Sequence, residues 1–173
     1  KGKYAEYNGN VYNHPNVNAF MGEGRSFLRS TDKEYDVIQM YSNHTSSSIA
    51  AGTGAMATTY LQTAEAYKEY FSHLKEDGIL HINHHVYPKM VSTAALAWKQ
   101  MGRKDFHRHM LVLEAVKEGF QDNLPTMLIK MQPWTEEEIQ EVSSYFHPVN
   151  KLVVHPLKPE GNMLSEEFFN AEI

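Results

Sequence analysis

The fold is decided by the stretch Gly22-Glu23-Gly24-Arg25-Ser26-Phe27-Leu28, which is followed shortly by Tyr35-Asp36-Val37-Ile38-Gln39-Met40. The residues just before it, Val17–Met21, form a candidate short strand that ends at a glycine. Glu23 would then lie at the tip of that strand. We interpret the two stretches as the third and fourth strand regions of an α/β sheet, and we expect the chain to begin in the middle of a fold.

Between these two strands the sequence predicts a short connection. Residues 26–29 favour a brief helix and residues 30–33 a polar turn. Val37–Met40 is a run that predicts a strand buried on both faces, as parallel strands are. The small-residue stretch Ser42–Thr59 that follows cannot build a core, and a mobile active-site loop would suit it.

Strand and helix then alternate. Apolar residues recur at helical spacing from Tyr60 to Leu74, which predicts an amphipathic helix. Gly78 would end this helix in the left-handed conformation and lead into a strand over residues 79–84. A second helix is predicted from Lys89 to about Met101.

Two further strands, Met110–Leu113 and Met127–Met131, predict an antiparallel pair. A helix should follow at Thr135, where Thr135 and Glu138 have the spacing of a capping box. Residues 156–173 show no clear period and predict an irregular tail. We therefore assign residues 1–155 to one α/β domain with a mostly parallel sheet, helices on its faces and an antiparallel pair of strands near its C-terminal end.

The charge, the cysteine content and the lengths of the apolar runs argue against several classes of protein. The 173 residues carry a net charge of −5, and no clustered positive face is evident, which argues against a nucleic-acid partner. The absence of cysteine excludes disulfides and suits a reducing compartment, so the expected location is the cytoplasm. No apolar run is long enough to span a bilayer, although a membrane-fused longer protein stays an alternative.

The order of these motifs, from Gly-Glu-Gly-Arg-Ser-Phe-Leu through Tyr-Asp-Val-Ile to Leu-Lys-Glu-Asp-Gly-Ile-Leu-His-Ile, resembles the spermidine synthase-like branch of the S-adenosylmethionine-dependent methyltransferase fold. The resemblance covers roughly residues 4–131 and is to the later part of that domain. It implies a partial Rossmann-like fold that lacks the first strands and the glycine-rich loop. It also implies S-adenosylmethionine or its decarboxylated form as a substrate, bound at the carboxyl ends of the parallel strands. This binding is expected only when the missing N-terminal part of the domain is present.

The resemblance places the family's adenine-binding acid at Glu23. A carboxylate accepts hydrogen bonds from an exocyclic amine, and Gly22 and Gly24 would permit close backbone approach. The alternative is that Glu23 only stabilises the N-terminus of the short helix after it. Arg25, by contrast, is expected to pair with a surface carboxylate.

The chain departs from the family after Ile38. Aminopropyltransferases place acidic residues there, whereas this chain has no carboxylate between Asp36 and Glu65. Spermidine synthesis is therefore disfavoured. His44 is the candidate base, because its ordinary pKa lies near neutrality. Tyr41, Ser42 and Asn43 would face the acceptor, together with His84 from the end of the next strand.

The chain also contains a group of histidines that invites a metal interpretation: His81, His84, His85, His107 and His109. Strand alternation would place His81 and His85 on one face and His84 on the other. No cysteine or intervening carboxylate assists them, so we expect no metal site.

Three hypotheses follow from the sequence. In the first, the full-length protein is a methyl- or aminopropyltransferase with small-molecule partners, a nucleotide and an unidentified acceptor, and the present part of it is expected to be inactive on its own. Alternatively, it is a non-catalytic binding or regulatory module that keeps the fold and lacks the catalytic aspartate. In the third hypothesis an exposed sheet edge pairs two copies into a homodimer.

Overall fold

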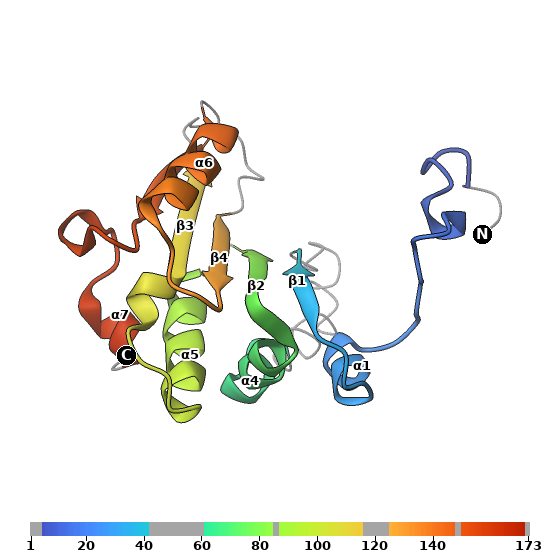
Figure 1. The fold of residues 1–173 in the computed structure, drawn as a ribbon, viewed down its shortest axis with the longest axis horizontal. Helices are drawn as coiled ribbons and strands as arrows, with labels where there is room; N and C mark the ends of the chain where they lie inside the picture. Colours follow the sequence, from blue (N-terminus) through green and yellow to red (C-terminus); the bar gives the residue numbers. More distant parts are fainter. Residues whose placement is uncertain (1–4, 42–60, 85–86, 116–124, 148–149, 172–173) are drawn as a thin grey trace, which may run out of the picture.

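The structure is a computed structural model that describes residues 5–41, 61–84, 87–115, 125–147 and 150–171. Its helices and strands alternate along the chain and build one five-stranded sheet with helices on both faces (Figure 1). The elements are η1 (Val11–Asn13), α1 (Gly24–Arg29), β1 (Tyr35–Met40), α4 (Ala64–Ser72), β2 (Leu74–Asn83), α5 (Tyr87–Gln100), η2 (Phe106–His109), β3 (Met110–Ala115), β4 (Thr126–Lys130), α6 (Glu136–Phe146), β5 (Asn150–Val154), η3 (Pro159–Gly161) and α7 (Glu166–Asn170).

The sheet has the strand order β1-β2-β4-β3-β5 and mixes parallel and antiparallel pairs. β1 and β2 are parallel, whereas β2–β4, β4–β3 and β3–β5 are antiparallel. Consequently β1, β2 and β3 run in one direction and β4 and β5 in the other. The α/β class, the partial Rossmann-like fold and the antiparallel β3–β4 pair are confirmed, and the mixture of directions is greater than the sequence indicated.

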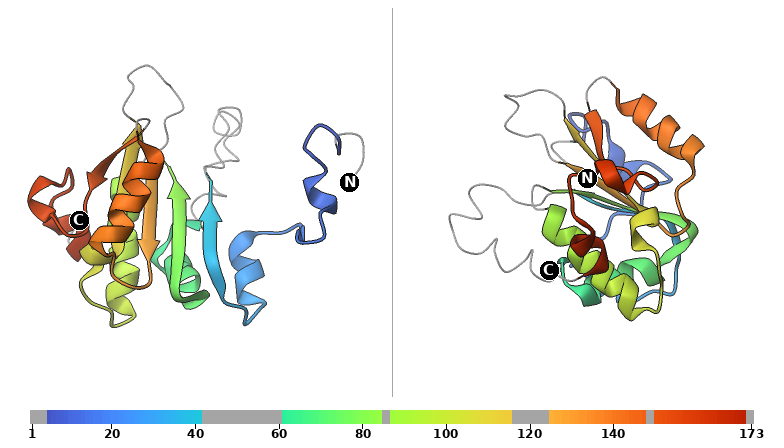
Figure 2. Two further views of the ribbon diagram at one scale, coloured as in Figure 1. Left: turned by 45° about the horizontal axis from the view of Figure 1, so that its top comes forward. Right: turned by 90° about the vertical axis from the view of Figure 1, so that its left-hand side faces the viewer.

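Two layers of helices cover the sheet (Figure 2). Helices α4, α5 and α7 pack on one face, where Trp98, Tyr67 and Phe71 are among the largest fully buried side chains. Helix α6 covers part of the other face, and Trp134 and Ile139 pack there against Leu111 and Leu113. Alternate residues of β3 thus enter different cores, as the period of a strand requires.

The boundary between α4 and β2 differs from the prediction. The helix ends at Ser72 and β2 begins at Leu74, so Gly78 lies inside the strand. Positive φ angles occur among the described glycines only at Gly9 and Gly102, and Gly78 is therefore not a left-handed cap. A Cβ on Gly78 would lie 3.0 Å from the Tyr35 carbonyl oxygen, so close approach of β1 explains the glycine.

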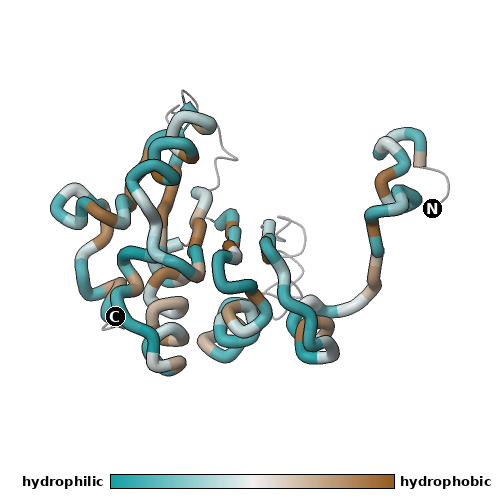
Figure 3. Tube along the Cα trace, in the orientation of Figure 1, coloured by the Kyte–Doolittle hydropathy of each residue, from teal (hydrophilic) through white to brown (hydrophobic). Residues whose placement is uncertain are grey.

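The first predicted strand does not form. Val17–Met21 has no strand assignment and belongs to an N-terminal arm that projects from the body, and hydrophobic segments of that arm stay in solvent (Figure 3). β1 is an edge strand whose Val37 is 54% exposed, so the expectation that it is buried on both faces was wrong. Among the described residues β1 has a neighbouring strand only on its β2 side, and an edge strand is less covered than a central one.

The C-terminal segment is more ordered than the sequence indicated. β5 joins the edge of the sheet beside β3. The tail predicted to be irregular contains η3 and α7, and it places Leu164 in the core beneath α5. The capping box at Thr135 and Glu138 is confirmed at the start of α6. Within the described ranges, each helix is too short or too polar to cross a bilayer.

Candidate functional site

The candidate site lies at the C-terminal ends of the parallel strands β1 and β2. Because these strands are parallel and adjacent, Tyr41 and His84 follow them at the same sheet edge. Tyr41 is 69% exposed, whereas His84 is 6% exposed and its backbone N–H donates to the Pro125 carbonyl at 3.2 Å. Ser42, Asn43 and His44 lie outside the described residues, so their predicted roles stay predictions.

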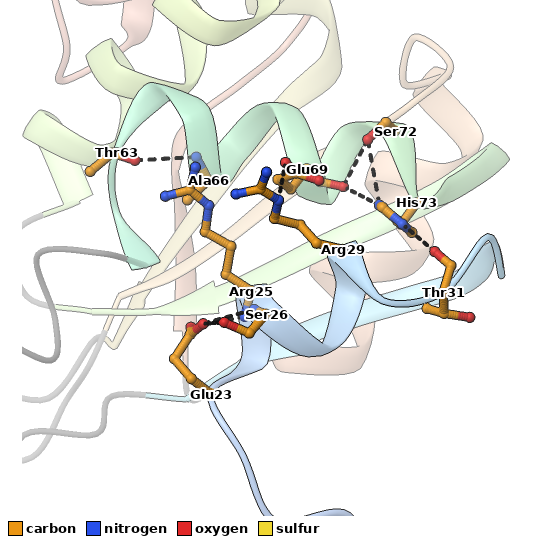
Figure 4. Close-up of polar contacts among 10 residues, drawn as sticks. All are labelled: Glu23, Arg25, Ser26, Arg29, Thr31, Thr63, Ala66, Glu69, Ser72 and His73. Atoms are coloured by element: carbon orange, nitrogen blue, oxygen red, sulfur yellow. Dashed lines mark hydrogen bonds and ion pairs between the residues drawn. The ribbon is translucent and has the colours of Figure 1, made fainter.

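Glu23 caps helix α1 with its carboxylate (Figure 4). The Arg25 N–H donates to Oε1 at 2.8 Å, and the Ser26 N–H and hydroxyl donate to Oε2 at 2.7 and 2.9 Å. Desolvation acts to raise the pKa of Glu23, but these hydrogen bonds outweigh it and hold the pKa below its ordinary value. The structure therefore shows the alternative role that the sequence offered for Glu23, in which its carboxylate stabilises the N-terminus of α1.

This capping role leaves Glu23 room for another partner. A carboxylate offers about four lone-pair positions, and the three hydrogen bonds from the described residues use one on Oε1 and two on Oε2. Oε1 can therefore accept one more donor without loss of the helix cap. Gly22 and Gly24 flank the carboxylate, and a Cβ on either would meet no atom within 4 Å in this chain, so the glycines themselves argue neither for nor against a ligand.

Arg25 extends from α1 toward the N-terminal end of α4 (Figure 4). Its Nε is buried and has no hydrogen-bond partner among the described residues, and it makes no ion pair there either. Its positive charge helps to lower the pKa values of Glu23 and Glu65, in each case as a minor cause. The expectation that Arg25 pairs with a surface carboxylate was wrong.

The described histidines serve other structural roles. His81 Nδ1 lies 3.0 Å from Gln39 Nε2, and burial lowers the pKa of His81. His109 Nδ1 contacts the Lys130 carbonyl at 3.0 Å, and its ring packs against Trp98. Across the ranges that the structure describes, no three histidine or acidic side chains gather as metal ligands would. His85 is outside those ranges.

Sequence reasoning missed one polar pair at the sheet edge. The buried Tyr87 of α5 and the half-buried Glu114 near the end of β3 interact electrostatically. Burial and then this negatively charged partner raise the pKa of Tyr87 to about 12. The only signal in the sequence was a carboxylate that breaks the apolar run of Met110–Leu113 at its end.

A separate open pocket of about 600 Å³ lies at the opposite side of the molecule, between the end of α5, η2 and the α7 segment. Trp98 and Phe106 form its apolar wall, and Lys99 and Lys104 contribute to its rim. It is remote from the ends of β1 and β2 and does not contribute to the candidate site.

No protein-family model matches the chain, and no curated protein matches its sequence. Solved structures do match its fold. A spermidine synthase in complex with the transition-state analogue AdoDATO has a TM-score of 0.51 at 15% identity, and the match covers 96% of this chain and 54% of that one. The spermidine synthase from Thermotoga maritima gives a TM-score of 0.52 with the same identity and coverage. The chain spans about half the length of these structures, and its fold is that of the spermidine synthase-like, methyltransferase-like α/β proteins.

Proposed function

We propose that the protein is a transferase that uses S-adenosylmethionine or decarboxylated S-adenosylmethionine as the group donor. The observation that carries this proposal is Glu23, which keeps a spare acceptor position on Oε1 in a spermidine synthase-like fold. Glu23 would accept a hydrogen bond from the adenine amine while it continues to cap α1. Tyr41, Ser42, Asn43 and His84 would face the acceptor.

The base in this proposal is His44. A histidine with an ordinary pKa is partly neutral at physiological pH and can accept the proton that an attacking nucleophile releases. The nucleophile then forms a bond to the carbon beside the sulfonium, and the carbon–sulfur bond breaks to leave a neutral thioether. His44 takes the place of the acid that the aminopropyltransferases carry after the corresponding strand.

A second candidate function rests on that same replacement. Residues Gln39–His44 contain amide, hydroxyl and imidazole groups but no carboxylate, so the countercharge for a polyamine is missing from this stretch. The absence of a carboxylate here is what we would expect of a module that binds a nucleotide without transferring a group. Methyl transfer, aminopropyl transfer and simple binding are distinguished by experiment.

The test is a calorimetric titration of each nucleotide into the complete protein, with the first strands of the domain present, and into its Glu23→Gln variant. An amide donates where the carboxylate accepts, so loss of the charged hydrogen bond should weaken binding by about 10- to 100-fold. Ser26→Ala is the matched control, because it removes one hydrogen bond to the same carboxylate but leaves the charge and the Oε1 position intact. Binding of neither nucleotide, or equal binding to wild type and Glu23→Gln, would contradict the proposal.

If a nucleotide binds, the nature of the function follows from two further measurements. Turnover of a bound nucleotide in the presence of candidate acceptors, abolished in His44→Ala, supports the transferase. Tight binding without turnover, unchanged in His44→Ala, favours the binding module. The preferred nucleotide identifies the group that is transferred.

A further inference from the structure

The side chain of His73, the residue after α4, bridges the end of that helix and the connection that follows α1 (Figure 4). Its ring Nδ1 lies 2.8 Å from the carbonyl oxygen of Glu69, in the last turn of α4. Its Nε2 lies 2.9 Å from the carbonyl oxygen of Thr31, two residues after α1 ends at Arg29. The half-buried ring therefore joins two segments that are 42 residues apart in the chain.

Each of these two contacts needs a proton on the ring nitrogen, because a carbonyl oxygen accepts hydrogen bonds and cannot donate them. A neutral imidazole has one N–H, so it would satisfy one contact and leave the lone pair of its other nitrogen against a carbonyl oxygen. The Ser72 hydroxyl lies 3.4 Å from Nδ1 but donates to the Glu69 carbonyl at 3.1 Å, so its proton does not serve Nδ1. The geometry therefore fits the imidazolium, in which both ring nitrogens donate.

The surroundings of His73 also favour the charged ring. The negative end of the α4 dipole lies here and attracts a cation. Burial acts to lower the pKa of His73, but the hydrogen bonds to the Glu69 and Thr31 carbonyls, together with the Glu69 carboxylate, outweigh burial and raise the pKa above its ordinary value. Arg29 of α1 lies 3.5 Å from that carboxylate. In the connection and the first residues of β1 and β2, the charged side chains nearest in sequence are exposed: Asp32, Lys33, Glu34, Asp36 and Lys75.

The placement of α1 depends on contacts of this kind. It is a helix of six residues, and a helix so short is not stable by itself in water. Glu23 caps its N-terminal end, and its C-terminal end is tied to α4 by the Arg29–Glu69 ion pair and by the His73 bridge. The Arg29 side chain is 64% exposed, so its ion pair contributes little. The bridge through His73 is thus the stronger of these two polar ties.

We propose that His73 is a pH-dependent positioning residue: in its protonated form it holds the end of α1 against α4, and loss of the proton releases that end and weakens nucleotide binding at Glu23. The effect on the nucleotide rests on the proposed function, whereas the bridge itself does not. The folded chain holds this proton more tightly than the unfolded chain does. The stabilisation is therefore complete below the ordinary pKa of about 6.5 and is lost as the pH rises through the folded pKa.

The bridge is tested first, without a nucleotide. Long-range proton–nitrogen NMR spectra report the protonation of each ring nitrogen, and His73→Gln assigns the signals. We expect both nitrogens of His73 to be mostly protonated at about pH 6.5, where an ordinary histidine is half protonated. Urea denaturation between pH 6 and 8.5 should show a loss of stability with rising pH that is smaller in His73→Gln. His147→Gln is the matched control and should behave as wild type does, because His147 follows α6 and its exposed ring makes no hydrogen bond in the described part of the chain.

The effect on the site is tested by titration of S-adenosylmethionine, and separately of its decarboxylated form, into the complete protein at pH 6 and pH 8.5. The affinity of wild type should fall about fivefold or more as the pH rises, whereas His73→Gln should keep the lower affinity at both pH values. Glu23 does not cause this profile, because its lowered pKa keeps it ionised across the range.

Two results would overturn the proposal. An unprotonated ring nitrogen in most His73 side chains at pH 6.5 would contradict the bridge, and a nucleotide affinity with the same pH dependence in wild type and His73→Gln would contradict its effect on the site. A doubly protonated ring in a protein that binds neither nucleotide would uphold the bridge and contradict the proposed transferase, so the two failures are distinguishable.

Discussion

Replacement of Gly78 tests how β1 and β2 approach each other. A Cβ at this position would lie 3.0 Å from the Lys75 backbone nitrogen, 3.0 Å from the Tyr35 carbonyl oxygen and 3.1 Å from the Leu74 Cβ. Two of these atoms belong to the backbone and cannot move away as the end of a long side chain can. Gly78→Ala therefore requires the strands to shift.

The expected cost is that of overpacking a tightly packed site, about 1 to 3 kcal/mol in the free energy of unfolding. Gly24→Ala is the matched control. Gly24 begins α1 and a Cβ there meets nothing within 4 Å, so the same chemical change should be neutral or stabilising by up to about 1 kcal/mol. Urea denaturation of both variants, followed by circular dichroism, measures the difference.

Gly78→Asn decides between the two explanations for this glycine. Asparagine tolerates the left-handed conformation, so a left-handed helix cap would accept it at small cost. The close approach to Tyr35 predicts instead that asparagine destabilises the protein at least as much as alanine does. If Gly78→Asn is clearly more stable than Gly78→Ala, the argument from close approach fails.

Two further predictions concern stability. Thr135→Ala removes a side chain that accepts from the Glu138 N–H and should lower the free energy of unfolding by about 1 kcal/mol. Ser165→Ala should change it little, because the Ser165 hydroxyl makes no capping hydrogen bond and donates only to the exposed Glu167 carboxylate. Equal effects in urea denaturation would refute the assignment. Burial, supported by the charges of Arg103 and Arg108, lowers the pKa of His109. The unfolded chain therefore binds a proton at a higher pH than the folded chain does, and stability that is present above about pH 6.5 should be lost as the pH falls toward the folded pKa. His109→Gln should reduce this loss between pH 7.5 and 5.5, and an unchanged pH dependence would show that His109 is not its source.

The elements that the sequence predicted correctly are those that depend on residues close together in the chain. The capping box at Thr135 required only residues three apart, and the antiparallel pair β3–β4 required two apolar runs. Helix α5 was found from its apolar spacing because Trp98, Met90 and Ala94 all enter the core. These features depend on residues that are close together in the chain, so one sequence is enough to predict them.

The failures came from contacts between distant residues. Gly78 has the sequence signature of a helix cap, yet the constraint on it is the Tyr35 carbonyl of another strand. The tail was predicted to be irregular because its sequence shows no clear period, whereas the order of its helix α7 depends on packing against α5. Glu114 drew no attention because its partner, Tyr87, follows another strand and meets it only when the sheet forms.

The placement of charge gives a physical reason to look for ligands at the ends of β1, β2 and β3. The ion pair between Lys75 and Asp36 joins the beginnings of β2 and β1, and Lys130 pairs with Glu138 where β4 reaches that same side of the sheet. Two ion pairs thus lie at the beginnings of the parallel strands. At the opposite edge, Glu114 lies near the Tyr87 hydroxyl and forms no ion pair with a described cation. A carboxylate that is partly removed from water and has no ion-pair partner costs stability, so this edge of the sheet is the less stable of the two in its placement of charge.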